Sequence, residues 1–270
     1  MVTRRSFIAT GAALTAAAII SPSVLGRNKY SAGVSPLNGK KVLFVWGGWM
    51  GHEPDKCRDI FVPWIKSEGG EVTVSDTLEA YTKYDLQKDF DLIVQTWTMG
   101  TIDGKQEKAL EDAVKSGTGL AGWHGGLGDS FRNNTEYQFM VGGQWVAHPG
   151  GVIDYRVNIV DHKDPVTKGL TDFDMHSEQY YVHVDPNVKV LATTTFSDKS
   201  ANWIGGNVIP VAWKKLYGKG RVFYSSLGHV AADFSVPQAL EIQKRGILWA
   251  CMSKYEPADE WKQPVYGKYK

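Results

Sequence analysis

Residues 119–132 read GLAGWHGGLGDSFR, a short apolar run that passes directly into a glycine-rich turn. We expect a buried strand over Gly119–Trp123, then the turn, then a helix near Ser130–Val141. The glycines let the side chain of His124 project above the end of the strand. The shape is that of a nucleophile elbow, but the elbow residue is histidine, so a serine or cysteine acyl-enzyme is not expected.

The chain before this stretch carries further short apolar runs. Lys41–Trp46 (KVLFVW) is rich in β-forming residues and predicts a buried strand, and two more strands are expected over 71–75 and 92–95. Helical segments lie between them. Strands that alternate with helices at this spacing favour a parallel sheet with helices on both faces.

The helices of this first half are expected from their start signals and their apolar periodicity. Pro54 is suited to the first turn of a helix, and apolar residues follow it at helical spacing, although Pro63 predicts a kink or an early stop. Asp103 followed by Gln106 forms a capping box for a second helix, and Gly117 is suited to its end.

The second half has a different pattern, in which strands follow one another without helices between them. Strands are expected over 152–160, 179–184 and 188–195, and they predict an antiparallel extension of the sheet. Two more, over 208–213 and 221–225, return to the main sheet before a last helix that begins at Pro237. The fold class is therefore α/β, with a mostly parallel sheet, helices on both faces and an antiparallel extension.

The first 26 residues have the pattern of a twin-arginine signal peptide. Arg4 and Arg5 precede an uncharged run over 8–25 and small residues near Gly26. We expect export to the periplasm or another extracytoplasmic place, with an uncleaved anchor as the alternative. No later run is long enough to span a membrane. The remaining chain divides into a leader over 27–40, one α/β domain over 41–255 and a tail over 256–270.

Charge and cysteine content narrow the expected partners. The chain has 30 Lys and Arg against 29 Asp and Glu, a formal charge of +1, so no nucleic-acid partner is expected. Cys57 and Cys251 fall at apolar helical positions, where buried thiols are expected and a disulfide is the alternative. The sequence indicates no oligomeric state.

Aromatic residues are numerous, with 10 Trp and 12 Tyr. They either form a large aromatic core or line a wall on which a flat-faced ligand such as a sugar stacks. Trp49, Trp97, Trp123 and Trp145 lie in or beside glycine-rich segments, so they are the better candidates for a ligand wall.

Polar residues of catalytic type follow several strand ends. His52, His124 and His229 each come after a strand of the expected sheet, and ligands of open α/β sheets bind at the carboxyl ends of the strands. His148 and Glu178 lie in the unusual segments GGQWVAHPGG and HSEQYY. No HExxH motif or cysteine cluster is present, so a divalent metal site formed by these five residues is an alternative to purely acid–base chemistry.

Each candidate also has an ordinary structural explanation. His124 is suited to general-base work or metal ligation, or it hydrogen-bonds the turn. Asp129 either orients His124 or caps the helix that follows. Arg132 either contacts a ligand oxygen or forms a surface ion pair, and Glu178 is a catalytic acid, a metal ligand or an exposed strand residue.

Several long segments together resemble the ThuA-like (trehalose utilisation) family. They are GWHGGLGDSFR, GGQWVAHPGG, DHKDPVTKGLTDFDMHSEQYYVH, PVAWKKLYGKGRVFYSSLGH and RGILWA, and the resemblance covers about 41–252. It implies the flavodoxin-like fold of the class I glutamine amidotransferase-like superfamily. The cysteine of those amidotransferases is absent beside His124, so amidotransferase activity is not expected. His229 resembles their catalytic histidine in position.

The resemblance also implies a carbohydrate ligand, because the family is linked to the use of trehalose and related disaccharides through sugars oxidised at C3. We expect cleavage of 3-keto-glycosides by elimination or hydrolysis, with His124 or His229 as base, Glu178 as acid or ligand and Asp129 in support. A metal ion on the keto oxygen would stabilise the enolate. A non-catalytic sugar-binding protein is the alternative. The residues expected to contact the sugar are Trp49, His52, Arg132, Trp145, His148 and Tyr180.

Overall fold

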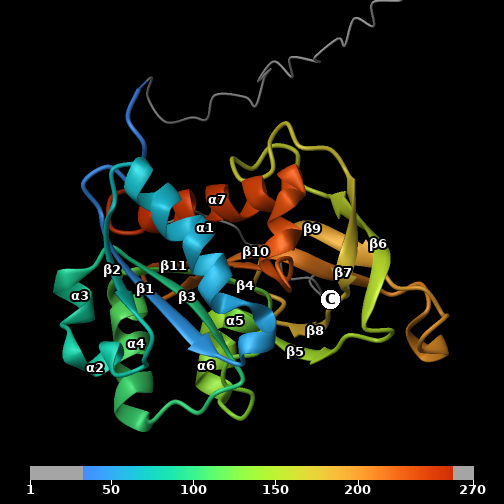
Figure 1. Ribbon diagram of the computed structural model, residues 1–270, viewed down its shortest axis with the longest axis horizontal. Helices are drawn as coiled ribbons and strands as arrows, with labels where there is room; N and C mark the ends of the chain where they lie inside the picture. Colours follow the sequence, from blue (N-terminus) through green and yellow to red (C-terminus); the bar gives the residue numbers. More distant parts are fainter. Residues whose placement is uncertain (1–32, 258–270) are drawn as a thin grey trace, which may run out of the picture.

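A nine-stranded sheet forms the centre of the protein, as Figure 1 shows for the computed structural model, which describes residues 33–257. The expected signal peptide and most of the expected C-terminal tail lie outside the described residues. In spatial order the strands are β2 (Glu71–Ser75), β1 (Lys41–Gly48), β3 (Leu92–Thr98), β4 (Gly119–Trp123), β11 (Gly220–Ser225), β10 (Val208–Tyr217), β9 (Lys189–Thr195), β6 (Val152–Ile159) and β7 (Phe173–Glu178).

The sheet has a parallel part and an antiparallel part. β2, β1, β3, β4 and β11 pair in parallel. β10, β9, β6 and β7 continue the sheet in antiparallel pairs. The prediction of a mostly parallel α/β sheet with an antiparallel extension is confirmed.

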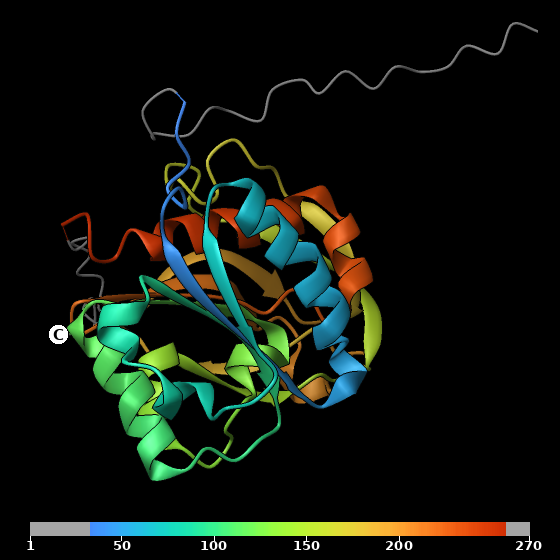
Figure 2. The same cartoon turned by 60° about the vertical axis from the view of Figure 1, so that its left-hand side comes forward.

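Helices cover both faces of the sheet, as Figures 1 and 2 show. Buried apolar side chains fill a separate core on each face. One face is covered by α1 (Pro54–Ser67) and α7 (Pro237–Cys251), and the other by α2 (Ala80–Lys83), α3 (Leu86–Asp89), α4 (Gly104–Ser116) and α6 (Thr135–Val141). Short helical turns lie in the connections: η1 (Met50–His52), α5 (His124–Gly128), η2 (Asn202–Ile204) and η3 (Ala231–Ser235).

The two long helices of the first half follow their sequence signals. α4 has the expected capping box, in which Asp103 accepts from the backbone of Gln106 and the Gln106 side chain returns to the backbone of Asp103. Pro54 begins α1 as expected, but the early stop expected from Pro63 is wrong. Pro63 lies on the exposed side near the end of the helix, where one lost hydrogen bond is tolerated.

The region between β4 and β9 departs most from the sequence-based expectation. The strand expected over 179–184 begins only at Tyr181, as β8 (Tyr181–Val184), and it pairs with β5 (Gly143–Ala147) outside the main sheet; β5 and β7 were not expected. Between β7 and β8 the Gln179 amide donates to the hydroxyl of Thr194, 2.7 Å away, and Tyr180 is buried in the core. The helix expected near Ser130 begins only at Thr135.

Both cysteines are buried and unpaired, so the disulfide alternative is wrong. Burial raises the pKa of each thiol, Cys57 and Cys251, to about 12, which leaves both protonated and unreactive. Trp123 is also buried, packed against Phe61 and Phe234, so it belongs to the core and cannot contact a ligand. Within residues 33–257, no helix combines the length and the apolar character needed to cross a membrane.

Candidate functional site

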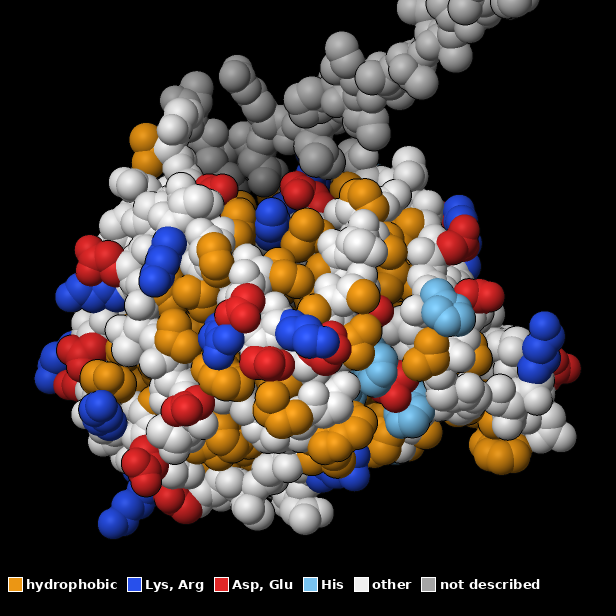
Figure 3. Space-filling model, viewed as in Figure 1, with side chains coloured by type: hydrophobic (Ala, Val, Ile, Leu, Met, Phe, Trp, Pro, Cys, Tyr) orange, Lys and Arg blue, Asp and Glu red, His pale blue; other side chains and the backbone are white. Residues whose placement is uncertain are grey.

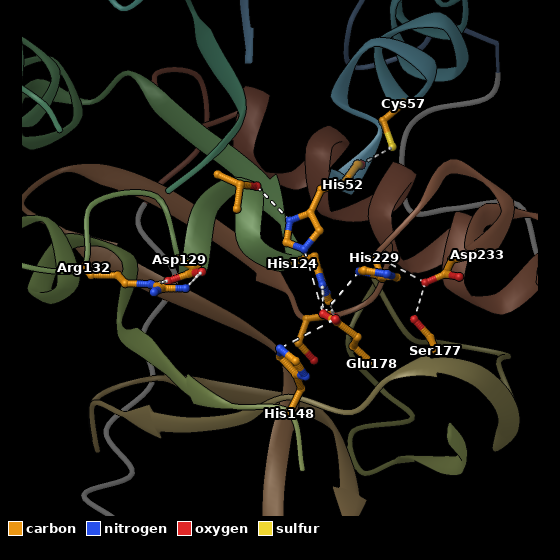
Figure 4. Close-up of polar contacts among 12 residues, drawn as sticks. His52, Cys57, His124, Asp129, Arg132, His148, Ser177, Glu178, His229 and Asp233 are labelled. Atoms are coloured by element: carbon orange, nitrogen blue, oxygen red, sulfur yellow. Dashed lines mark hydrogen bonds and ion pairs between the residues drawn. The ribbon is translucent and has the colours of Figure 1, made fainter. Parts of the chain in front are cut away.

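Four side chains converge at the carboxyl ends of the parallel strands. His52 lies in η1 after β1, His124 is the first residue of α5 after β4, and His229 follows β11. Glu178, the last residue of β7, approaches from the antiparallel part. Figure 4 shows the three imidazoles directed toward the carboxylate. Segments more than a hundred residues apart along the chain therefore meet at the edge where open α/β sheets bind ligands.

The glycines around His124 allow this approach. The backbone of His124 has a φ of 45°, a conformation that non-glycine residues rarely adopt and that marks a sharp strand-to-helix turn. A Cβ atom on Gly125 would lie 2.5 Å from Cε1 of His52, and one on Gly126 would lie 2.7 Å from Cα of Thr96. Only glycine permits the two histidine-bearing segments to pack this closely.

Three of the imidazoles approach a single carboxylate oxygen. Oε2 of Glu178 lies 3.1 Å from Nε2 of His124, 3.2 Å from Nδ1 of His229 and 3.9 Å from Nε2 of His52. Oε1 of the same carboxylate lies 3.7 Å from Nε2 of His148. Glu178 is buried, so the alternative of an exposed strand residue is wrong. His52, His124, Glu178 and His229 place ligand-type atoms within 4.8 Å of one another, a set that could hold a metal ion.

Hydrogen bonds on the far side of two rings orient them. Nδ1 of His124 lies 2.9 Å from the carbonyl oxygen of Ser226, and Nδ1 of His52 lies 2.9 Å from the hydroxyl of Thr98. A carbonyl oxygen only accepts, so Nδ1 of His124 donates and carries a proton. In both rings, Nε2 is the nitrogen that faces Glu178.

Burial changes the pKa of two of the imidazoles, and the contacts around Glu178 change that of the carboxylate. Burial lowers the pKa of His52 to about 3 and also lowers the pKa of His124. Burial alone would raise the pKa of Glu178, but the contacts from His124 and His229 outweigh it and hold that pKa well below its usual range. A lowered pKa favours the ionised form of Glu178 at neutral pH, which fits the expected role of ligand better than that of proton donor.

Tyr180 supports the cluster and is not a sugar-contacting ring. Its ring stacks on His124 with centroids 3.8 Å apart, and the residue is 2% exposed. The preceding residue, Gln179, holds the segment between β7 and β8 by its hydrogen bond to Thr194. The expectation that Tyr180 contacts a sugar is therefore wrong, because the bend between β7 and β8 turns the ring against the histidine.

Asp129 lies outside the cluster. Its carboxylate accepts two hydrogen bonds from the Arg132 guanidinium, at 2.5 and 2.8 Å, and Figure 4 shows this pair to one side of Glu178. Both expected roles of Asp129 are wrong, because Ser226 holds Nδ1 of His124 and the following helix is capped by Asn134. Arg132 lies over the ring of Trp145, 4.3 Å from its centroid.

One side of the cluster reaches the surface. The side chain of His148 is 39% exposed and its ring lies 5.7 Å from that of Trp145. Trp49 is 47% exposed and meets the edge of His52 at a centroid distance of 4.8 Å. Histidine and acidic side chains gather at one place on the face drawn in Figure 3. Of the expected sugar contacts, Trp49, Arg132, Trp145 and His148 keep exposed surface. His52 is only 7% exposed and faces Glu178, so the expectation that it contacts a sugar is wrong.

Four supporting residues were not expected from the sequence: Thr98, Ser177, Ser226 and Asp233. Asp233 accepts from the hydroxyl of Ser177 at 2.6 Å and from the backbone N–H of His229 at 2.9 Å, so it ties the loop of His229 to the strand of Glu178. Thr98 was detectable in principle, because it also ends a parallel strand. The other three depend on contacts between distant segments and leave no local signal.

Comparison with known proteins shows both family and fold. The sequence model of the ThuA family, described as trehalose utilisation, matches residues 41–250. The structure is similar to a ThuA-like protein from Bacteroides uniformis, at 16% identity over 83% of this chain and 96% of that chain, with a TM-score of 0.66. It is similar also to a ThuA-like protein from Parabacteroides merdae, at 16% identity over 83% of this chain and 93% of that chain, with a TM-score of 0.61.

A more distant similarity is to a β-galactosidase from Bacillus circulans sp. alkalophilus, at 14% identity and a TM-score of 0.51. The similarity covers 85% of this chain and 33% of that chain, so it concerns one part of a larger enzyme. At these identities the solved structures show the fold alone. No curated protein matches the chain in sequence.

Proposed function

The chain belongs to the ThuA family, described as trehalose utilisation, and from this premise we propose that its site cleaves the glycosidic bond of 3-keto-glycosides by elimination. The observation that carries the proposal is the position of His148. This imidazole is 39% exposed, lies 3.7 Å from the buried carboxylate of Glu178 and is flanked by Trp145. A proton acceptor beside an aromatic face is suited to a sugar substrate.

His148 is a better base than the histidines expected for that role. Nδ1 of His124 is held by Ser226, Nε2 faces Glu178 at 3.1 Å, and the side chain is 1% exposed, so no substrate atom reaches it. His229 directs Nδ1 to the same carboxylate. His148 alone of these three has a large exposed fraction, which leaves its imidazole accessible to a substrate.

The proposed reaction begins at C2 of the sugar ring. The ketone at C3 acidifies the C2 proton, which passes to the imidazole of His148. The electron pair of the broken C–H bond forms an enolate with the ketone. When that pair returns to form a C1–C2 double bond, the glycosidic C1–O bond breaks and the leaving oxygen takes up a proton. The products are a free sugar and an unsaturated 3-keto sugar.

The surrounding residues support this step in distinct ways. The ionised carboxylate of Glu178 lies beside His148 and stabilises the imidazolium that forms when the base accepts a proton. The exposed side chain of Trp49 offers apolar surface to the sugar, and the guanidinium of Arg132 lies over the ring of Trp145, which neighbours His148. A positioned base contributes about 10²–10⁴-fold to the rate.

The test is an assay of the purified chain with 3-keto-trehalose and with a 3-keto-glucoside, in which the released sugar and the unsaturated product are measured. His148→Gln is expected to lower kcat by about 10²–10⁴-fold. His183→Gln, an exposed histidine on β8, is the matched control and keeps full activity. Saturable binding of both substrates without turnover by the unaltered chain would replace this proposal with that of a sugar-binding protein.

We also propose that the protein acts outside the cytoplasm, because residues 1–26 carry the pattern of a twin-arginine signal. Replacing Arg4 and Arg5 by lysine is expected to retain the protein inside the cell. Cell fractionation with an antibody against the mature chain measures this. An unchanged distribution would contradict export by this pathway.

A further inference from the structure

We propose that His52, His124, His229 and Glu178 together bind one first-row divalent transition-metal ion, of the class of Zn²⁺. The ligand atoms are Nε2 of His52, Nε2 of His124, Nδ1 of His229 and Oε2 of Glu178. The inference goes beyond the proposed function, because metal binding is independent of which substrate the site accepts.

The spacing of the ligand atoms fits an ion at their centre. Two atoms that each lie about 2.0–2.1 Å from a tetrahedral ion are about 3.3–3.4 Å apart. Oε2 of Glu178 is 3.1, 3.2 and 3.9 Å from the nitrogens of His124, His229 and His52. No pair among the four atoms exceeds 4.8 Å. Rotations of the rings by small angles therefore bring all four to bonding distance.

The hydrogen bonds of His124 give a second, independent reason. Nδ1 donates its proton to the carbonyl oxygen of Ser226, so in the neutral ring Nε2 has only a lone pair. That lone pair is directed at the carboxylate oxygen of Glu178, 3.1 Å away. With the proton on Nδ1, a neutral His124 has no proton to donate to this oxygen, whereas a cation placed between the two atoms bonds to both.

His229 shows the same lack of a hydrogen-bond partner. Its Nδ1 atom is buried and makes no hydrogen bond within the described part of the chain, although it lies 3.2 Å from Oε2 of Glu178. Nearly all buried polar atoms of native proteins have a hydrogen-bond partner. A buried nitrogen without one is therefore a candidate position for an ion or a bound molecule. A metal ion at the centre of the four atoms satisfies this nitrogen.

The ligand types select the class of metal. Three imidazoles and one carboxylate favour Zn²⁺ and its neighbours over Ca²⁺ and Mg²⁺, which prefer oxygen ligands. The supporting contacts are those typical of such sites, because the far nitrogens of His124 and His52 are held by Ser226 and Thr98. Cys57 is not a ligand, since its thiol lies against the carbonyl oxygen of His52.

The first experiment measures metal stoichiometry and affinity. The purified chain is stripped with a chelator and titrated calorimetrically with Zn²⁺ and, separately, with Ca²⁺. We expect one Zn²⁺ per chain and no binding of Ca²⁺ at matched concentration. His229→Ala and Glu178→Gln are expected to weaken Zn²⁺ binding by more than 100-fold, beyond the about 10–100-fold that loss of a supporting contact costs. His176→Ala, which removes an exposed histidine of β7, keeps the affinity.

The second experiment uses the unaltered chain and so does not depend on whether the variants fold. X-ray absorption of the Zn²⁺-loaded protein is expected to show three imidazoles and one oxygen at about 2.0–2.1 Å and no sulfur. A sulfur ligand, fewer than two imidazoles, or a cluster variant that binds Zn²⁺ as well as the unaltered chain would overturn the proposal. Loss of turnover with Zn²⁺ binding intact would instead count against the proposed substrate alone.

Discussion

Two histidine–carboxylate pairs share the same strand and differ in almost every other respect. His176 and Glu178 are two residues apart on β7, and alternation along a strand directs both side chains from the same face. His176 pairs with Asp154 at 2.7 Å, and the two side chains are 72% and 89% exposed. Glu178 pairs with His124 at 3.1 Å, and the side chains are 11% and 1% exposed.

The comparison shows that the shorter contact is not the more consequential one. The His176–Asp154 pair lies in water, where a charge is solvated and an ion pair contributes little. At Glu178 the same face of the strand reaches the edge covered by the histidine-bearing turns, and water solvates the carboxylate far less. Position in the fold, rather than residue type or spacing, therefore makes one pair a candidate site and the other a surface contact.

The largest expected effect comes from neutralising the buried carboxylate. Glu178→Gln removes the charge that stabilises an imidazolium at His148, and we expect kcat on a 3-keto-glycoside to fall by at least about 10²–10⁴-fold. Asp154→Asn makes the same chemical change in the exposed pair and is expected to leave kcat unchanged. Steady-state assays of both variants measure the contrast. A Glu178→Gln variant within threefold of the unaltered chain would remove the distinction between the two pairs.

The second prediction extends the contrast to stability. Lys214 and Asp164 form an ion pair in which each side chain is 2% exposed, whereas Arg156 and Asp174 pair with 53% and 75% exposure. Asp164→Asn leaves a buried ammonium without its main anion and is expected to cost about 3–5 kcal/mol of unfolding free energy. Asp174→Asn is expected to be nearly neutral. Urea denaturation of the two variants measures the difference, and equal midpoints would contradict it.

The same buried pair gives a pH dependence with a defined sign. Burial alone would raise the pKa of Asp164, but the ammonium groups of Lys214 and Lys189 outweigh it and hold that pKa below its ordinary value. The stability that the pair contributes is thus complete above the unfolded value of about 3.9 and is lost as pH falls through the lower, folded value. Denaturation midpoints of the unaltered chain and of Asp164→Asn should converge below about pH 4.

The parallel part of the fold was predictable because its signals are local. KVLFVW at 41–46 and the capping box at Asp103 determine their elements through residues a few positions away, and both were found as expected. β5 and the break after Glu178 depend on partners that are distant in sequence. Fifteen positions separate Gln179 from Thr194, whose hydroxyl holds the bend, and no periodicity records that contact.

The site was predictable to the same extent and for the same reason. The rule that ligands bind at strand ends selects His52, His124 and His229 from the sequence, because it needs only the strand ends. The roles of their neighbours could not be read in this way. Asp129 follows His124 closely in sequence yet pairs with Arg132, while the carbonyl that orients His124 belongs to Ser226, 102 positions further along.

The third prediction applies the buried-versus-exposed contrast to hydroxyl groups. The hydroxyl of Thr98 lies 2.9 Å from Nδ1 of buried His52, and the hydroxyl of exposed Thr82 bonds the carbonyl of Glu79 in its own helix. Thr98→Val keeps the shape but frees the His52 ring, so we expect Zn²⁺ affinity to fall by about 10–100-fold. Calorimetric titration measures it. Thr82→Val is the control, and an equal affinity in both variants would contradict the assigned role of Thr98.

The smallest effect is expected for the exposed pair itself. A histidine and a carboxylate that both lie in water exchange hydration for a weak, salt-screened contact, so removing the carboxylate has almost no cost. Asp154→Asn is therefore expected to shift the Tm by at most about 2 °C, and the shift should vanish in high salt because screening already removes the attraction. Differential scanning calorimetry in low and high salt measures both. If Asp154→Asn lowered the Tm as much as Asp164→Asn, the contrast would fail. The short 2.7 Å separation between His176 and Asp154, and not their exposure to water, would then determine the strength of this ion pair.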